Sequence, residues 1–205
     1  MVAERVAHWE TIWTEREPSS LSWFQTSTDF SSALIMRFAA DRTSRVVDVG
    51  GGASGLPGDL LDHGYSALTV VDISTAALRT NIARLGGRGS QVRWISTDVT
   101  VWQPDRSFDV WHDRAVFHFL TEPTDRGAYV ACAARALDHD GVLIVGTFAL
   151  DGPDRCSGIP VQRYDADQLG AVFTPHFAMV SVEPHQHVTP SGGVQPFTFV
   201  VFRRN

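Results

Sequence analysis

Aspartates and glycines are concentrated at the points where short apolar segments of the sequence end. The segment 45–58 reads RVVDVGGGASGLPG, with Asp48 inside an apolar run and glycines directly after it. A glycine turn lets a ligand approach bare backbone, and the helix that follows supplies unpaired N–H groups and a positive dipole end. Gly50, Gly52 and Gly55 satisfy the pattern G-x-G-x-x-G, with Asp72 about 20 residues on. Taken alone, this pattern is typical of a dinucleotide site.

A second set of polar residues lies at the end of the segment 108–112, which reads FDVWH. His112 and Asp113 could act as general bases, and so could His185 and His187 near the end of the chain. Arg114 is suited either to an acceptor carboxylate or to an ion pair with a nearby acid. The sequence contains no lysine, which excludes a P-loop lysine and a Schiff base formed by this chain. The two cysteines fit no metal-ligand spacing and no disulfide framework, so no metal is expected.

Alternating strand and helix patterns must position these residues. Strands are predicted over 46–49, 67–72, 92–95, 108–112 and 142–148, with helices over 56–63, 74–85 and 123–137. This alternation predicts an α/β fold with a mainly parallel sheet, in which ligands bind beyond the carboxyl ends of the strands. After a short helix over 164–173, the stretches 176–188 and 197–203 have no helix between them and should form an antiparallel pair.

The N-terminal 41 residues contain aromatic side chains at an unusual density. Apolar residues at helical spacing predict one helix over 2–16 and a second over 31–40. Trp9, Trp13, Trp23 and Phe24 could simply fix this segment to the domain, or they could line an acceptor pocket over a cofactor. The expected organisation is a single domain over 1–205. In it, residues 1–41 form a helical lid or acceptor wall and residues 45–205 form the cofactor-binding core.

Length and charge limit the classes of partner. A chain of 205 residues suggests one domain with its own core. The net charge is −6 and no basic block is present, so no nucleic-acid partner is expected. The longest apolar run, 142–150, is far shorter than the roughly 20 residues that a membrane helix needs. With a polar N-terminus, the expected location is cytoplasmic and no membrane partner is expected.

Three features argue against a dinucleotide: Asp48 inside the first strand, Asp98 after the third strand, and the C-terminal hairpin. The motifs VVDVGGGAS, VVDIS, STDVT, FDVWHDRAVFHFL and LDHDGVLIVGTF resemble, in order and spacing, those of class I S-adenosylmethionine-dependent methyltransferases. That resemblance covers roughly residues 45–148 and implies a Rossmann-like seven-stranded sheet with helices on both faces and an antiparallel end. Within the family, Asp113, Arg114 and Ala115 look most like thiopurine S-methyltransferases and the small lysine methyltransferases related to the citrate synthase and elongation-factor enzymes.

The resemblance implies a role for each motif in binding S-adenosylmethionine. Asp48 and the turn of Gly50, Gly51 and Gly52 should hold the methionine part, with Ser54 standing where the family has a third glycine. Asp72 should accept hydrogen bonds from the ribose hydroxyls. The adenine should contact Ile73, Asp98 and the backbone of Val99. His112 and Asp113 stand where the family's fourth motif faces the methyl group.

The reaction implied is an in-line displacement on the cofactor's methyl group, which requires positioning of the acceptor and exclusion of water. The expected acceptor is an S, N or O nucleophile of a small molecule, and the expected acceptor contacts are Trp13, Trp23, Phe24 and Cys156. Asp113, His112 and Arg114 are the expected catalytic residues. Three alternatives stay open: a protein lysine methyltransferase, a nicotinamide oxidoreductase and a cofactor-binding scaffold without catalysis. The sequence does not indicate the oligomeric state.

Overall fold

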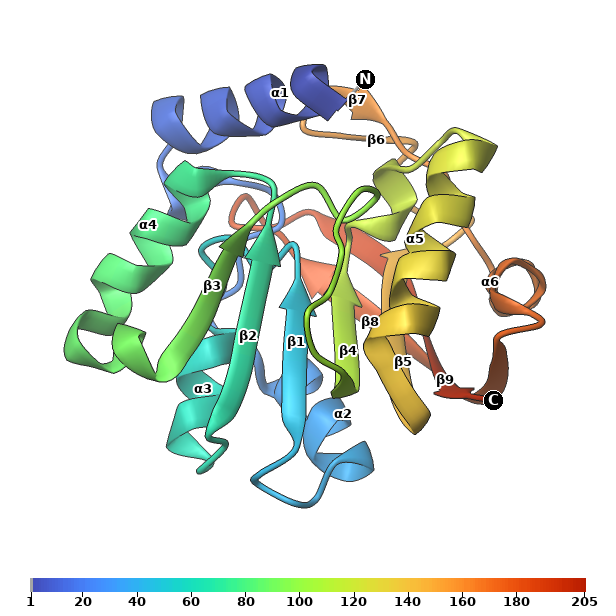
Figure 1. The fold of residues 1–205 in the computed structure, drawn as a ribbon. Coiled ribbons are helices and arrows are strands. Elements are labelled where there is room, and N and C mark those ends of the chain that lie inside the picture. The colour runs from blue at the N-terminus through green and yellow to red at the C-terminus, as the bar shows by residue number, and fades with distance from the viewer. Residues whose placement is uncertain (1) are drawn as a thin grey trace.

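A seven-stranded sheet forms the centre of the computed structural model, which describes residues 2–205. Met1, part of the predicted N-terminal segment, lies outside the described residues. The order in the sheet is β3-β2-β1-β4-β5-β9-β8 (Figure 1). The strands are β1 (Arg45–Val49), β2 (Ala67–Asp72), β3 (Val92–Ser96), β4 (Phe108–Arg114), β5 (Leu137–Phe148), β8 (Phe177–Val188) and β9 (Val194–Arg204). Strands β1 to β5 are parallel, and β9 is antiparallel to both β5 and β8. The predicted fold class is confirmed.

Helices cover both faces of this sheet. They are α1 (Val2–Glu15), α2 (Asp29–Phe38), α3 (Leu56–Asp62), α4 (Thr75–Leu85), α5 (Pro123–Ala136) and α6 (Ala166–Phe173). Side chains of a strand alternate between faces, so Val46 packs in a core cluster with α2, α3 and α4, and Val47 packs in a second cluster with α5 and α6. Two of these helices are capped, since Ser74 and Asp165 accept hydrogen bonds from backbone N–H groups in the first turns of α4 and α6.

Two strands are longer than predicted. Strand β5 begins at Leu137 and not at residue 142, because the buried Leu137 pairs with Phe108 of β4 although polar residues follow it. Strand β4 runs through Asp113 and Arg114, which were expected just beyond its end. The last two residues of β4 therefore point to opposite faces of the sheet, and this decides which of them can reach a ligand.

The helix α1 lies across the carboxyl ends of the parallel strands (Figure 1). A short hairpin, β6 (Arg155–Cys156) with β7 (Ile159–Pro160), lies at the same end of the molecule. The chain also contains three short 3-10 helices, at Pro18–Ser20, Gly86–Gln91 and Phe117–Phe119. Over residues 2–205, none of the helices combines the length and apolar character needed to cross a membrane.

Candidate active site

One pocket lies between α1 and the carboxyl ends of β1, β2 and β4. All but one of the predicted site residues line it. The lining includes the expected cofactor residues Asp48, Gly50, Gly51, Gly52, Ser54, Asp72, Ile73, Asp98 and Val99, the expected acceptor residues Trp13, Trp23, Phe24 and Cys156, and also His112 and Arg114. The exception is Asp113. Cofactor and acceptor candidates that are far apart in the sequence thus share a single pocket.

The glycine turn after β1 is tightly packed. Gly50 has φ +67° and Gly52 has φ +46°, in the left-handed region that residues with a side chain rarely adopt. A Cβ atom on Gly50 would lie 1.9 Å from Cγ2 of Val116, and one on Gly52 would lie 2.9 Å from the Trp13 ring. Val116 and Trp13 therefore occupy the space that side chains on Gly50 and Gly52 would take.

Asp72 supports the turn from the end of β2. One carboxylate oxygen accepts the N–H of Gly52 at 2.9 Å and the other accepts the N–H of Ser74 at 2.8 Å. Burial raises the pKa of Asp72 to about 7 despite these two bonds. Each oxygen retains capacity to accept a further hydrogen bond from a ligand.

Asp98 connects the pocket to α1. Its Oδ1 atom accepts the N–H and the hydroxyl of Thr100, and its Oδ2 atom accepts Nε of Arg5 at 2.9 Å. Arg5 also donates to Asp125 at 2.5 Å. The carboxylate predicted to contact adenine is thus also the anchor of the N-terminal helix.

Asp48 and His112 form a buried pair on adjacent strands. Nδ1 of His112 lies 2.7 Å from Oδ1 of Asp48, and Nε2 lies 3.0 Å from the hydroxyl of Ser31 on α2. A carboxylate only accepts hydrogen bonds, so Nδ1 carries a proton toward Asp48, and Nε2 forms the hydrogen bond to Ser31. The other oxygen of Asp48 is buried and has no hydrogen-bond partner among residues 2–205. Ser31 was missed because only tertiary packing brings α2 beside β4.

Asp113, expected to be catalytic, is not brought to the pocket. It is fully buried on the opposite face of the sheet, where it accepts the N–H groups of Val116 and Phe117 and the hydroxyl of Tyr129 at 2.5 Å. Burial raises the pKa of Asp113 to about 6. Strand alternation explains the difference, because neighbours His112 and Asp113 must face opposite sides of β4. Asp113 therefore stabilises the fold by accepting these hydrogen bonds, and the geometry does not support its expected catalytic role.

The N-terminal residues 2–24, which we call the roof segment, cover the pocket. Trp23 packs edge-on against Trp9 and Trp13, with ring centroids 5.9 and 6.2 Å away, and Trp9 also contacts Phe119 at 4.9 Å. Glu10 fixes the roof segment to α4 by accepting hydrogen bonds from the N–H groups of two residues in its first turn and from the Ser74 hydroxyl. A carboxylate at that place also interacts favourably with the helix dipole.

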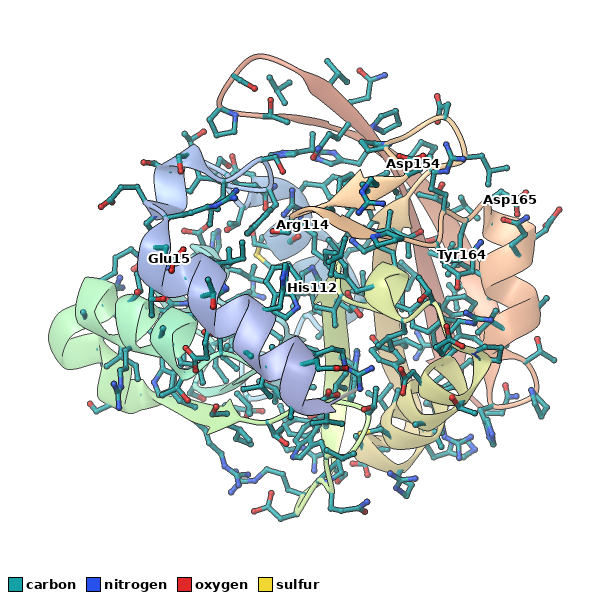
Figure 2. The ribbon with its side chains drawn as sticks, turned by 90° about the horizontal axis from the view of Figure 1, so that it is seen from above. Glu15, His112, Arg114, Asp154, Tyr164 and Asp165 are labelled. Carbon is teal, nitrogen blue, oxygen red and sulfur yellow. The ribbon has the colours of Figure 1, made fainter. Side chains whose placement is uncertain are left out.

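Arg114 and Cys156 lie at the other side of the pocket. Figure 2 shows Arg114 and His112 near the centre of the view, between α1 and the β6–β7 hairpin. Burial lowers the pKa of Arg114 to about 10 and raises the pKa of Cys156 to about 11, so at neutral pH the first is a cation and the second a thiol. His187 was named above as a possible general base. Its Nε2 atom lies 2.7 Å from the carbonyl oxygen of Ser22.

Comparison with known proteins supports the same assignment. Residues 46–141 match a family model described as a methyltransferase domain. No curated protein matches the sequence. Among solved structures, an S-adenosylmethionine-dependent methyltransferase from Anabaena variabilis is similar with TM-score 0.77 and 13% identity, covering 98% of this chain and 95% of that chain.

A second solved structure, 1,6-didemethyltoxoflavin-N1-methyltransferase from Burkholderia thailandensis, is similar with TM-score 0.72 and 20% identity, covering 100% of this chain and 91% of that chain. At these identities the likeness shows the fold alone. The methyltransferase-domain match over residues 46–141, on a chain with this fold and this pocket, supports an enzyme of the S-adenosylmethionine-dependent methyltransferase type.

Proposed function

We propose that the enzyme transfers the methyl group of S-adenosylmethionine to an S, N or O nucleophile of a small molecule that binds beneath the roof segment. The observation that carries this proposal is the single pocket, which is lined on one side by Asp48, Asp72 and the glycine turn and on the other by Trp23 and Cys156. A donor and an acceptor bound in one covered pocket can be held in a reactive alignment away from water.

The residues present fit the cofactor. The unpartnered, buried oxygen of Asp48 is suited to a cationic amino group, and the oxygens of Asp72 are suited to vicinal hydroxyls. Gly50 and Gly52 contribute bare backbone to the lining of the pocket, in a conformation that suits glycine. When bound, the cofactor supplies a methyl carbon already activated by its sulfonium charge. We assign Asp48, Asp72, Asp98 and the turn to cofactor binding on this basis.

In the proposed mechanism the protein mainly positions groups. His112 orients Asp48, since both of its ring nitrogens are engaged in the chain from Ser31 to Asp48. Trp13 packs against the glycine turn and closes the pocket from above. Among the described residues, the acids and the imidazole that line the pocket are Asp48, Asp72, Asp98 and His112. All four belong to the proposed cofactor site. The mechanism therefore suits a nucleophile that needs no dedicated base, such as a thiolate or a neutral aromatic nitrogen.

The roof segment favours a small acceptor over a protein side chain. Trp9, Trp13 and Trp23 lie across the side of the pocket through which a folded protein would have to reach. The similar Burkholderia enzyme is described with a bound small heteroaromatic molecule, 1,6-didemethyltoxoflavin, which fits an aromatic wall of this kind.

Two measurements test the proposal. S-adenosylhomocysteine should raise the melting temperature of the protein and NAD should not, because only a ligand of the native state stabilises it. The shift should be lost in Asp72→Ala and kept in Asp151→Ala, an exposed aspartate used as the matched control. Incubation with methyl-labelled S-adenosylmethionine and a cell lysate should then place the label in the small-molecule fraction. A labelled protein band would contradict the small acceptor, and a shift with NAD alone would contradict the cofactor.

A further inference from the structure

Arg114 is a buried cation that the proposed cofactor site does not use. Its side chain lines the pocket, but its Nε and Nη2 atoms are shielded from water and have no hydrogen-bond partner within the part of the chain that the structure describes. Among residues 2–205, no ion pair joins its guanidinium to a carboxylate. Donors buried without acceptors destabilise a protein, so such a group in a pocket calls for a ligand that supplies the acceptors.

The surroundings of Arg114 fix its orientation. Nη1 donates to the carbonyl oxygen of Trp23 at 3.1 Å, and the guanidinium lies 5.2 Å from the centroid of the Phe197 ring. These two contacts leave free the edge that carries Nε and Nη2. That edge presents two parallel N–H groups, which match the two oxygens of a carboxylate.

The other groups that face Arg114 come mostly from elements outside the cofactor motifs. They are His118, Cys156 of β6 and, on β8, His185 and His187. Burial lowers the pKa of all three histidines, so they are neutral at pH 7 and do not compensate the charge. Asp48 is the one acid that acts on Arg114 electrostatically, and it is already bonded to His112. The free edge therefore belongs to the acceptor side of the pocket.

We infer that Arg114 binds a carboxylate of the methyl acceptor, and that the natural acceptor is an aromatic carboxylic acid. This inference rests on the proposed function and names its substrate class. Trp23 and Phe24 line the same pocket and provide an aromatic wall for the ring. Both nitrogens are shielded from water in this structure, so a ligand that pairs with them must displace the atoms that cover them.

The test uses the full chain saturated with S-adenosylhomocysteine. Matched aromatic acids and amides (benzoate with benzamide, 2-naphthoate with 2-naphthamide, indole-3-carboxylate with its amide) are titrated by calorimetry and by thermal shift. The wild type should bind at least one acid about 10- to 100-fold more tightly than its amide, as expected for paired charge-assisted hydrogen bonds. Arg114→Gln should abolish this preference. Arg114→Lys, which keeps the charge without the bidentate edge, should retain only part of it.

Three controls separate the possible outcomes. Arg79→Gln, an exposed arginine on α4, should leave the preference unchanged. Arg114→Gln should melt no lower than the wild type, because it removes an unpaired buried charge. It should also leave the affinity for S-adenosylhomocysteine unchanged. A tenfold loss of that affinity would overturn the inference, because it would assign Arg114 to the cofactor's own carboxylate. The absence of any preference for an acid in the wild type would also overturn it. Failure of the wild type to bind S-adenosylhomocysteine would instead refute the proposed function.

Discussion

Nδ1 of His112 lies 2.7 Å from the carboxylate of Asp48 because the two residues are register partners on the parallel strands β4 and β1. Parallel pairing places side chains of the same face beside each other, so the pair forms without a loop to position it. One oxygen of Asp48 is thereby held, and the other is left for a ligand.

Replacement of His112 should therefore affect cofactor binding through Asp48. His112→Leu removes the donor and should weaken S-adenosylhomocysteine binding by about tenfold, the value of one hydrogen bond to a charged group. His112→Asn carries an N–H near the position of Nδ1 and should recover most of the affinity. Isothermal titration of both variants checks this, with Ser31→Ala as a milder third variant. Equal loss in the leucine and asparagine variants would contradict a positioning role.

Asp113 should matter for stability and not for binding. Asp113→Ala removes the acceptor of two buried donors and one partly buried donor and should lower the free energy of unfolding by about 3 kcal/mol or more. Chemical unfolding monitored by circular dichroism measures this loss. The affinity of the folded variant for S-adenosylhomocysteine should equal that of the wild type. A stable variant with weakened binding would return Asp113 to the active site.

Gly50 should tolerate no side chain while Val116 is present. Gly50→Ala places a methyl group 1.9 Å from Cγ2 of Val116 and keeps a residue with φ +67°, so it should lower the free energy of unfolding by several kcal/mol. In a Val116→Ala background the clash is removed and only the backbone strain of about 1–2 kcal/mol remains. A double-mutant cycle by urea unfolding measures this coupling. Additive effects would show that the two residues do not meet.

Asp72 should make the unliganded protein less stable as pH rises. Its pKa is about 7 in the folded state against 3.8 as the reference, so the folded protein holds a proton that the unfolded chain loses from about pH 4 upward. The contribution of Asp72 to stability falls through this window and is constant above pH 7. The free energy of unfolding of Asp72→Asn minus that of the wild type should therefore increase by up to about 4 kcal/mol between pH 4 and pH 8. A difference that is constant over this range would contradict the raised pKa.

Glu10 should control how firmly the roof segment closes. Its carboxylate accepts hydrogen bonds at the first turn of α4, and these bonds lower its pKa against the effect of burial. Glu10→Ala should accelerate dissociation of S-adenosylhomocysteine about tenfold, as expected from the loss of a charged helix cap. Stopped-flow tryptophan fluorescence measures this rate, since Trp9, Trp13 and Trp23 lie in the roof segment. Glu15→Ala, an exposed acid of the same helix, is the matched control and should dissociate at the wild-type rate.

The sequence by itself was sufficient for the parallel sheet, the C-terminal hairpin and most of the residues that line the pocket. Hydrophobic periodicity and the glycine turn are local signals, and strands in a parallel sheet bring their carboxyl ends to one edge. The motifs around Asp48, Asp72 and Asp98 could therefore be placed in one pocket before the structure was known. The same strand alternation could also have separated His112 from Asp113, had the full length of β4 been recognised.

Only the tertiary structure decided what each remaining side chain does. Ser31 meets His112, and Arg5 meets Asp98, across 81 and 93 residues of sequence. Such contacts depend on how α1 and α2 pack, which no local pattern encodes. The free edge of Arg114 is likewise visible only when its three-dimensional neighbours are known, because an arginine in a sequence looks the same whether it is paired or not. The unpaired charge is the structural feature that points to the chemistry of the acceptor.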